Sequence, residues 1–183
     1  MHIAVEGPDS TGKAAAARQL AQALDGLYID KPLQYLLGGR SRYTQLAEKL
    51  NAQPSKDLRA WFYGFSNLYF SDYLAERTVV TDRYFPSNWV SNCTRDNLPA
   101  FDALAAEIRR PEHTFLLSGS GPDADTPSQT DAQLETLYRQ CLDRYGFPYT
   151  VLETTRLQPA EVLTEMLFVL REQGLLSGGS TVP

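Results

Sequence analysis

The amino-acid sequence predicts an α/β protein in three layers, in which a parallel sheet of about five strands is covered by helices on both faces. Three observations lead to this prediction. Short apolar runs alternate with longer segments whose apolar residues recur at helical spacing. The 183 residues suit one domain and are enough to bury a core. A glycine-rich loop joins the first apolar run to the first helical segment, at the edge where such sheets bind their ligands.

Five short apolar runs are expected to form the sheet. Each is bounded by a turn residue or a polar segment, and a short continuous apolar run is typical of a parallel strand that is buried on both faces. Gly7 follows the first run and Pro32 follows the second. The predicted strands cover residues 2–6, 27–30, 78–81, 114–118 and 149–153.

Helical segments separate these runs. The first is followed by Gly26, a residue that suits the end of a helix. A long helix is expected after Pro54, with Ser55 as its N-terminal cap. Pro159 suits the first turn of the last helix. Besides the long helix, the predicted helices cover residues 13–25, 41–52, 100–110, 129–145 and 159–172.

The long helix carries many aromatic residues. Its apolar positions recur at helical spacing, and they are Leu58, Trp61, Phe62, Phe65, Leu68 and Tyr69. Aromatic residues in such a stripe usually belong to the core. We therefore expect Trp61, Phe62, Phe65 and Tyr69 to be buried.

Composition narrows the range of partners. The formal net charge of −5 provides no basic surface for nucleic acid or for an anionic membrane. No apolar run approaches the roughly 20 residues that span a bilayer, and no signal peptide is expected before the loop. Cys93 and Cys141 fit no metal-binding spacing, which favours reduced thiols in a cytoplasmic protein. Residues 177–183 are expected to form a disordered tail.

Residues 7–14 read GPDSTGKA, which has the spacing of a phosphate-binding loop. In such loops backbone N–H groups converge on phosphate oxygens, the following helix presents its positive end, and a lysine adds a cation. The loop follows a predicted strand and precedes a predicted helix, as this mechanism requires. We expect it to bind the phosphates of ATP through Gly7, Ser10, Thr11, Gly12, Lys13 and Ala14.

A second motif, 79-VVTDRYFPSN-88, follows a buried strand and is expected at the same edge of the sheet as the loop. Its Asp-Arg-Tyr-x-x-Ser pattern resembles that of the thymidylate kinase family of nucleoside monophosphate kinases. The opening Glu-Gly-Pro-Asp at residues 6–9 is similar to that family's Glu-Gly-x-Asp. The resemblance spans most of the chain and implies a single P-loop NTPase domain over residues 1–176.

The resemblance implies roles for the residues of the two motifs. Lys13 would contact the donor phosphates of ATP, and Asp9 would lie beside the sugar and phosphate of the acceptor. Arg83 would hold the acceptor phosphate, and Asp82 would lie near a Mg²⁺ ion. If the acceptor were a nucleoside, Glu6 would take the proton of a sugar hydroxyl, as in the related deoxynucleoside kinases.

Further positions correspond to the part of the family site that receives the base and the sugar. Asn88, next to Ser87, would contact a pyrimidine base. Tyr63 and Asn67, one helical turn apart, are the nearest equivalents of a Phe and an Arg that read the base in the family, with Phe65 and Tyr69 as a competing pair. Ser91 stands where family members place an aromatic ring that helps to exclude a 2′-hydroxyl. We therefore expect a ribonucleotide or a modified pyrimidine nucleotide to be accepted.

Two departures from the family pattern bear on catalysis. Ala14 replaces the serine or threonine whose hydroxyl holds Mg²⁺. The loop that corresponds to the family's lid, about residues 119–131, contains three aspartates, and no Lys or Arg occurs between Arg110 and Arg139. Arg95 is the best remaining candidate for the missing cation, and Arg40 and Arg42 are weaker ones.

Three functions stay open at this point. The first is an ATP-dependent kinase that phosphorylates a nucleoside 5′-monophosphate or a nucleoside. The second is a catalytically impaired relative that binds nucleotides and acts by association with a partner. The third is a P-loop kinase with a non-nucleotide acceptor. Members of the family commonly form dimers through the face that carries the long helix, so a homodimer is also expected.

Overall fold

The chain folds around one five-stranded sheet in which all neighbouring strands are parallel. The computed structural model describes residues 1–30, 32–119 and 129–176. The strand order is β2-β3-β1-β4-β5, so the first strand lies in the middle of the sheet. The strands are β1 (His2–Glu6), β2 (Leu27–Ile29), β3 (Val79–Asp82), β4 (His113–Ser118) and β5 (Tyr149–Glu153).

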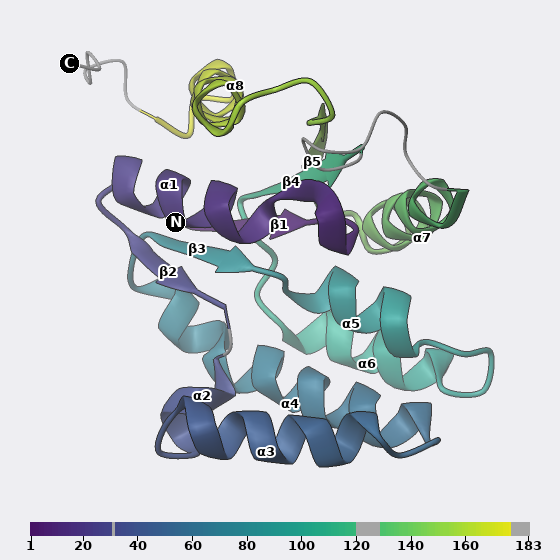
Figure 1. Cartoon of the computed structure of the whole chain (residues 1–183). Helices are drawn as coiled ribbons and strands as arrows, with labels where there is room; N and C mark the ends of the chain where they lie inside the picture. Colours follow the sequence, from purple (N-terminus) through teal and green to yellow (C-terminus); the bar gives the residue numbers. More distant parts are fainter. Residues whose placement is uncertain (31, 120–128, 177–183) are drawn as a thin grey trace.

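Helices form the outer layers, as Figure 1 shows. Their bounds are α1 (Lys13–Ala23), α2 (Leu33–Leu36), α3 (Arg40–Asn51), α4 (Lys56–Ala75), α5 (Phe85–Asn92), α6 (Leu98–Glu107), α7 (Gln129–Tyr145) and α8 (Pro159–Glu172). A single 3₁₀ turn, η1 (Asp9–Thr11), lies between β1 and α1. All five strands and the helices expected from the sequence are present, with ends that differ by a few residues.

The alternation of side chains along β1 separates two cores. Ile3 and Val5 are fully buried on the face that α1 and α8 cover, where they pack with Leu20 and Met166. Ala4 belongs to the opposite core, to which α4, α5, α6 and α7 contribute. Figure 1 shows the same division, with α1 and α8 above the sheet and α4, α5 and α6 below it. The predicted three-layer α/β fold is therefore confirmed.

Two helices were not expected from the sequence. α5 begins directly after the Asp-Arg-Tyr motif and has Pro86 in its first turn, where the missing N–H costs no hydrogen bond. It is only eight residues long, and α2 is four, so neither shows an extended helical periodicity. The predicted cap of the long helix is confirmed, because the N–H of Leu58 donates to Ser55 Oγ over 3.4 Å.

The aromatic stripe of α4 is the main correction to the sequence analysis. The side chains of Trp61, Phe65 and Tyr69 are 66%, 51% and 50% exposed, so the prediction that they belong to the core is wrong. Phe62 is half-buried and packs against a small cluster that includes Tyr43. Small and polar residues occupy the buried side of α4 instead, together with Phe70 and Leu74.

No helix within the described ranges is both long enough and apolar enough to span a lipid bilayer.

Candidate active site

The glycine-rich loop turns tightly at the carboxyl end of β1. Gly7 has a φ of +136°, and a Cβ there would collide with the carbonyl oxygen of Leu117 on β4. Gly12 has a φ of +77° and precedes the first residue of α1. Lys13, which opens α1, is buried, and its ammonium group donates to the carbonyl oxygen of Pro8. Burial lowers the pKa of Lys13 to about 8.

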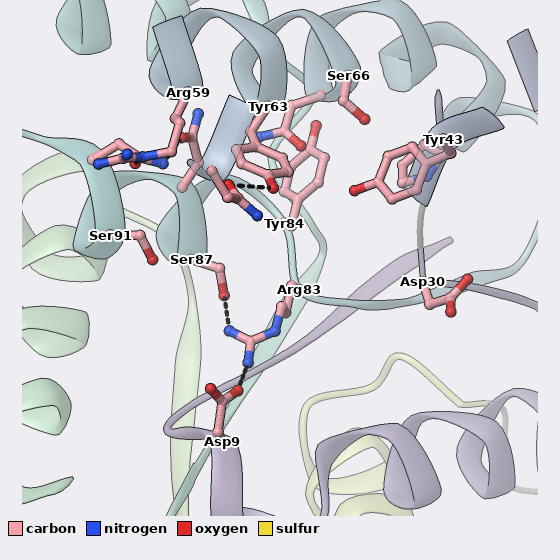
Figure 2. A pocket seen from close by; sticks show the side chains of 15 residues that line it. Asp9, Asp30, Tyr43, Arg59, Tyr63, Ser66, Arg83, Tyr84, Ser87 and Ser91 are labelled. Atoms are coloured by element: carbon pink, nitrogen blue, oxygen red, sulfur yellow. Dashed lines mark hydrogen bonds and ion pairs between the residues drawn. The ribbon is translucent and has the colours of Figure 1, made fainter. Parts of the chain in front are cut away.

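Arg83 lies beside this loop in an unusual backbone conformation. It follows β3 with a φ of +71°, which is rare for a residue that has a side chain. Its guanidinium group forms an ion pair with Asp9 and donates to Ser87 Oγ over 3.3 Å and to the Tyr138 hydroxyl over 3.5 Å. Figure 2 shows Arg83 between Asp9 and Ser87. The backbone strain therefore places a cation in front of the loop.

Glu6 is fully buried behind Arg83, and both of its carboxylate oxygens have protein partners. Oε1 accepts a hydrogen bond of 2.7 Å from the backbone N–H of Tyr84, and Oε2 accepts one from the hydroxyl of Ser87. Burial raises the pKa of Glu6 to about 7, while the hydrogen bonds and the charge of Arg83 oppose this rise.

Buried titratable groups predict how stability depends on pH. Burial lowers the pKa of His2 to about 3 and that of His113 to about 4, so both bind protons only after unfolding as the pH falls below 6.5. Glu6 has the opposite effect, because its raised pKa of about 7 lets the folded state bind a proton first. Two histidines outweigh one glutamate, so the free energy of unfolding should fall by about 1 kcal/mol per pH unit between pH 6 and 5.

The variant Glu6→Gln isolates the glutamate. This variant lacks the stabilisation that protonation of Glu6 gives the folded state and keeps the destabilising effect of the two histidines. The free energy of unfolding of the variant should therefore fall about twice as steeply as that of the wild type over the same pH range. Urea titrations at pH 7.0, 6.0 and 5.0 measure both slopes. Equal slopes in the two proteins would show that Glu6 keeps an ordinary pKa in the folded state.

Asp82, the last residue of β3, has the properties expected of a ligand for Mg²⁺. Its Oδ2 accepts a hydrogen bond of 3.3 Å from the Tyr28 hydroxyl, whereas Oδ1 is buried and has no partner among the described residues. Burial raises the pKa of Asp82, and Arg83 and Lys13 oppose this rise. The described residues contain no cluster of three or more His, Cys, Asp or Glu side chains that could hold a metal. A single carboxylate nevertheless suits Mg²⁺, which usually retains several waters.

A cavity of about 450 Å³ opens beside Arg83 and extends to α4. All seven residues that the sequence analysis assigned to the acceptor line it: Asp9, Tyr63, Asn67, Arg83, Ser87, Asn88 and Ser91. The competing pair, Phe65 and Tyr69, is exposed and does not line this cavity. α4 therefore turns Tyr63 and Asn67, rather than Phe65 and Tyr69, towards this cavity.

None of the arginines suggested as replacements for the lid forms a hydrogen bond or ion pair with a described residue of the glycine-rich loop. Arg95 is exposed in the connection between α5 and α6 and does not line the cavity, which makes it a poor candidate. Arg40 forms an ion pair of 3.0 Å with Asp30 on the opposite wall, and Arg42 is exposed on α3. Of the predicted lid, residues 120–128 lie outside the described residues, as does the predicted tail, 177–183.

Several residues of the site carry no recognisable signal in the sequence. Asp30, Tyr43 and Arg59 line the cavity from three separate segments, and the Tyr138 hydroxyl reaches Ser87 over 3.1 Å from α7. No motif spacing relates these positions, since only the folded chain brings them together. For Tyr138 alone the sequence offers some indication, because its hydroxyl lies on a face of α7 that is otherwise formed by apolar residues such as Cys141 and Leu142.

Comparisons with known proteins support the fold. No protein-family model and no curated protein sequence matches the chain. Among solved structures, thymidylate kinase from Candida albicans is similar with a TM-score of 0.69 at 16% identity, over 94% of this chain and 92% of that one. Deoxyadenosine kinase from M. mycoides, solved with dCMP and dCDP, gives 0.64 at 12% identity, over 94% and 100%. The YorR protein of Bacillus subtilis, solved with phosphorylated GDP, gives 0.51 at 16% identity, over 97% and 99%. The chain therefore has the fold of these proteins, two of which are kinases.

Proposed function

We propose that this protein is an ATP- and Mg²⁺-dependent kinase that transfers the γ-phosphate of ATP to a nucleoside 5′-monophosphate. One observation carries the proposal: Arg83 stands between the glycine-rich loop and the cavity, within hydrogen-bond reach of Asp9 and Ser87. A phosphate held by this guanidinium group would face the loop, and the attached nucleoside would extend into the cavity. That is the arrangement an in-line transfer requires.

The donor side of the site would be formed by the loop and the start of α1. Backbone N–H groups from Gly7 to Ala14 would bind the β- and γ-phosphates, and Lys13 would exchange its contact with Pro8 for a phosphate oxygen. Asp82 would contribute one ligand to Mg²⁺ through its unpartnered Oδ1. Mg²⁺ would neutralise charge on the phosphates of the donor.

A monophosphate suits the site better than a nucleoside does. A nucleoside acceptor needs a catalytic base with a free oxygen to remove the hydroxyl proton. Both carboxylate oxygens of Glu6 already accept hydrogen bonds, one from the N–H of Tyr84 and one from the hydroxyl of Ser87. A monophosphate needs no such base, because one of its oxygens attacks the γ-phosphorus while the bond to the bridging oxygen breaks and ADP leaves. Ser91 on the cavity wall supports acceptance of a ribose, since a serine leaves space beside the 2′-hydroxyl.

A thermal-shift screen tests the binding part of this proposal. We expect a nucleoside 5′-monophosphate at millimolar concentration to raise Tm, and the matching nucleoside to raise it much less, because the nucleoside lacks the group that Arg83 would hold. UMP with uridine, and dTMP with thymidine, are the matched pairs. Equal shifts within each pair would favour a nucleoside acceptor.

A second candidate function is a nucleotide-binding relative that has lost catalysis. Ala14 favours it, because the loop lacks the hydroxyl that would hold Mg²⁺. The two functions predict different outcomes for the variant Ala14→Ser. In a working kinase this variant should tighten binding of Mg²⁺–ADP several-fold and raise turnover. Calorimetry with and without Mg²⁺, together with an assay of ADP release, measures both. Absence of turnover in both proteins would favour the binding relative.

We also propose a homodimer formed through α4. Its exposed face carries an apolar stripe composed of Leu58, Trp61, Phe65, Leu68 and Tyr69. Large exposed apolar patches of this kind mark sites of protein association. The variant Phe65→Glu should convert a dimer to a monomer in analytical ultracentrifugation, whereas Phe168→Glu, at an exposed apolar residue of α8, should not. Weak dimers associate at a protein concentration of about 100 µM. A wild-type protein that is still monomeric at that concentration would contradict the proposal.

A further inference from the structure

Ser87 joins a buried carboxylate to the cation at the edge of the cavity. Its hydroxyl donates to Glu6 Oε2 and accepts a hydrogen bond of 3.3 Å from Arg83 Nη1 (Figure 2). Because the single hydroxyl proton of Ser87 is given to Glu6, the contact of 3.1 Å with the Tyr138 hydroxyl has Tyr138 as its donor. While Glu6 is ionised, all three hydrogen bonds at Ser87 therefore have one defined direction.

Glu6 is fully buried, and the guanidinium group of Arg83 is its main counter-charge. This cation is shared, because Asp9 on the cavity wall forms an ion pair with the same group. The effect of burial therefore prevails, and it raises the pKa of Glu6 to about 7. Burial also raises the pKa of the two ionisable side chains of α7 near Glu6, so these stay neutral. The ionisable groups that interact with Glu6 from neighbouring elements are Arg83 after β3, Lys13 at the start of α1, and Tyr138 and Cys141 on α7.

Protonation of Glu6 disrupts none of the hydrogen bonds around it. Oε1 keeps the N–H of Tyr84, and a proton on Oε2 is donated to Ser87 Oγ. The hydroxyl of Ser87 then donates to Tyr138, since a phenol oxygen can accept a hydrogen bond. The ionised and the neutral forms of Glu6 thus fit the same arrangement of side chains. They differ in whether Glu6 shares the charge of Arg83.

We propose that Glu6 takes up a proton when a phosphomonoester binds to Arg83, and that it returns the proton when the diphosphate product leaves. This inference rests on the proposed function, because it assumes that Arg83 holds the acceptor phosphate. The proton comes from the solvent, a new O–H bond forms at Oε2, and no bond of the nucleotide changes in this step. Glu6 is a positioning residue here, because it acts on the phosphate through Ser87 and Arg83.

The direction of this coupling follows from the charges. A phosphomonoester has a second pKa of about 6, so it arrives at pH 7.5 as a dianion. A like charge beside a buried carboxylate favours the protonated form of that carboxylate. Once Glu6 is neutral, the guanidinium group of Arg83 no longer divides its charge between Glu6 and the phosphate. Proton uptake and phosphate binding therefore strengthen each other by the same factor.

Two measurable results follow if the phosphate makes protonation of Glu6 about tenfold more favourable. At pH 7.5 the wild type should take up about half a proton for each UMP bound, and Kd for UMP should be about fourfold higher at pH 8.5 than at pH 7.0. Calorimetry of UMP in HEPES and in Tris at pH 7.5, without ATP or Mg²⁺, measures the uptake. The two apparent binding enthalpies differ by the number of protons taken up multiplied by the difference in buffer ionisation enthalpy.

The variant Glu6→Gln imitates the protonated form, because its amide can accept from the N–H of Tyr84 and donate to Ser87. We expect it to take up no proton and to bind UMP several times more tightly than the wild type at pH 8.5. The matched control is Glu153→Gln, because Glu153 ends β5 at the same edge of the sheet but is exposed and does not line the cavity. This control should keep the uptake and the pH dependence of the wild type.

Proton uptake by the wild type is a test on its own, because it needs no variant. Binding of UMP without any uptake, or with release of protons, would overturn the inference and leave the proposed function intact. Uptake that persists in Glu6→Gln would also overturn it, and would place the proton on another group such as Lys13, whose pKa is about 8. A wild-type protein that does not bind UMP, dTMP or any other monophosphate would overturn this inference and the proposed acceptor together.

Discussion

Replacing Arg83 with glycine should abolish productive acceptor binding without lowering the stability of the fold. The guanidinium group is the cation between the loop and the cavity, and a comparable charge clamp contributes about a thousandfold or more to the rate of phosphoryl transfer. The backbone at Arg83 has a φ of +71°, which glycine adopts without strain. We therefore expect kcat/KM for the monophosphate to fall by about a thousandfold.

The matched control is Arg83→Ala, which loses the same guanidinium group but keeps a Cβ in the left-handed region. Both variants should lose activity to the same extent, while Arg83→Gly should be the more stable of the two by about 1 kcal/mol. Urea denaturation and steady-state kinetics separate these effects. Retained activity in both variants would show that the acceptor phosphate is held elsewhere.

Replacing Lys13 with alanine should weaken the binding of ATP and ADP by at least about tenfold, because an interaction of an ammonium group with phosphate contributes about 1.5–3 kcal/mol. Lys13 is buried at the start of α1 and already donates to a carbonyl oxygen of the loop, so a phosphate oxygen can take that position. Calorimetry with ADP and Mg²⁺ measures the loss.

Lys49→Ala serves as the control for Lys13→Ala, because Lys49 is exposed near the end of α3 and does not line the cavity. This variant should bind ADP as tightly as the wild type does. Even very weak binding is detectable with nucleotide at millimolar concentration. Absence of binding of any purine nucleotide to the wild type under these conditions would rule out both the kinase and the nucleotide-binding relative.

The parts of the site that could be predicted from the sequence are those whose chemistry is contained in a short segment. The loop at residues 7–14 needs its glycines and lysine at fixed spacing. Asp82 ends β3 at the edge where a parallel sheet binds its ligands. The side walls of the cavity could not be predicted in this way. Asp30, Tyr43 and Tyr138 approach the cavity or Arg83 from segments far apart in the chain, and no local pattern links them.

The aromatic stripe of α4 shows a different limit. Helical periodicity indicates which residues share a face, but it does not indicate whether another element covers that face. Trp61 and Phe65 share a face that no described element fully covers, whereas Ser66 and Asn67 are buried against α5 and the cavity. The hydrogen-bond partners of Asn88 were likewise beyond the sequence, because its contact with Ala60 depends on how α4 and α5 are placed relative to one another.

The most direct test of the account is phosphoryl transfer from ATP to UMP, followed by ³¹P NMR in the presence of Mg²⁺. We expect ADP and UDP to appear in equal amounts, and their formation to be lost in Lys13→Ala and in Arg83→Gly. Binding of both nucleotides without any formation of UDP, dTDP or another nucleoside diphosphate from its monophosphate would contradict the proposed kinase. That result would identify the protein as a nucleotide-binding relative that has lost catalysis.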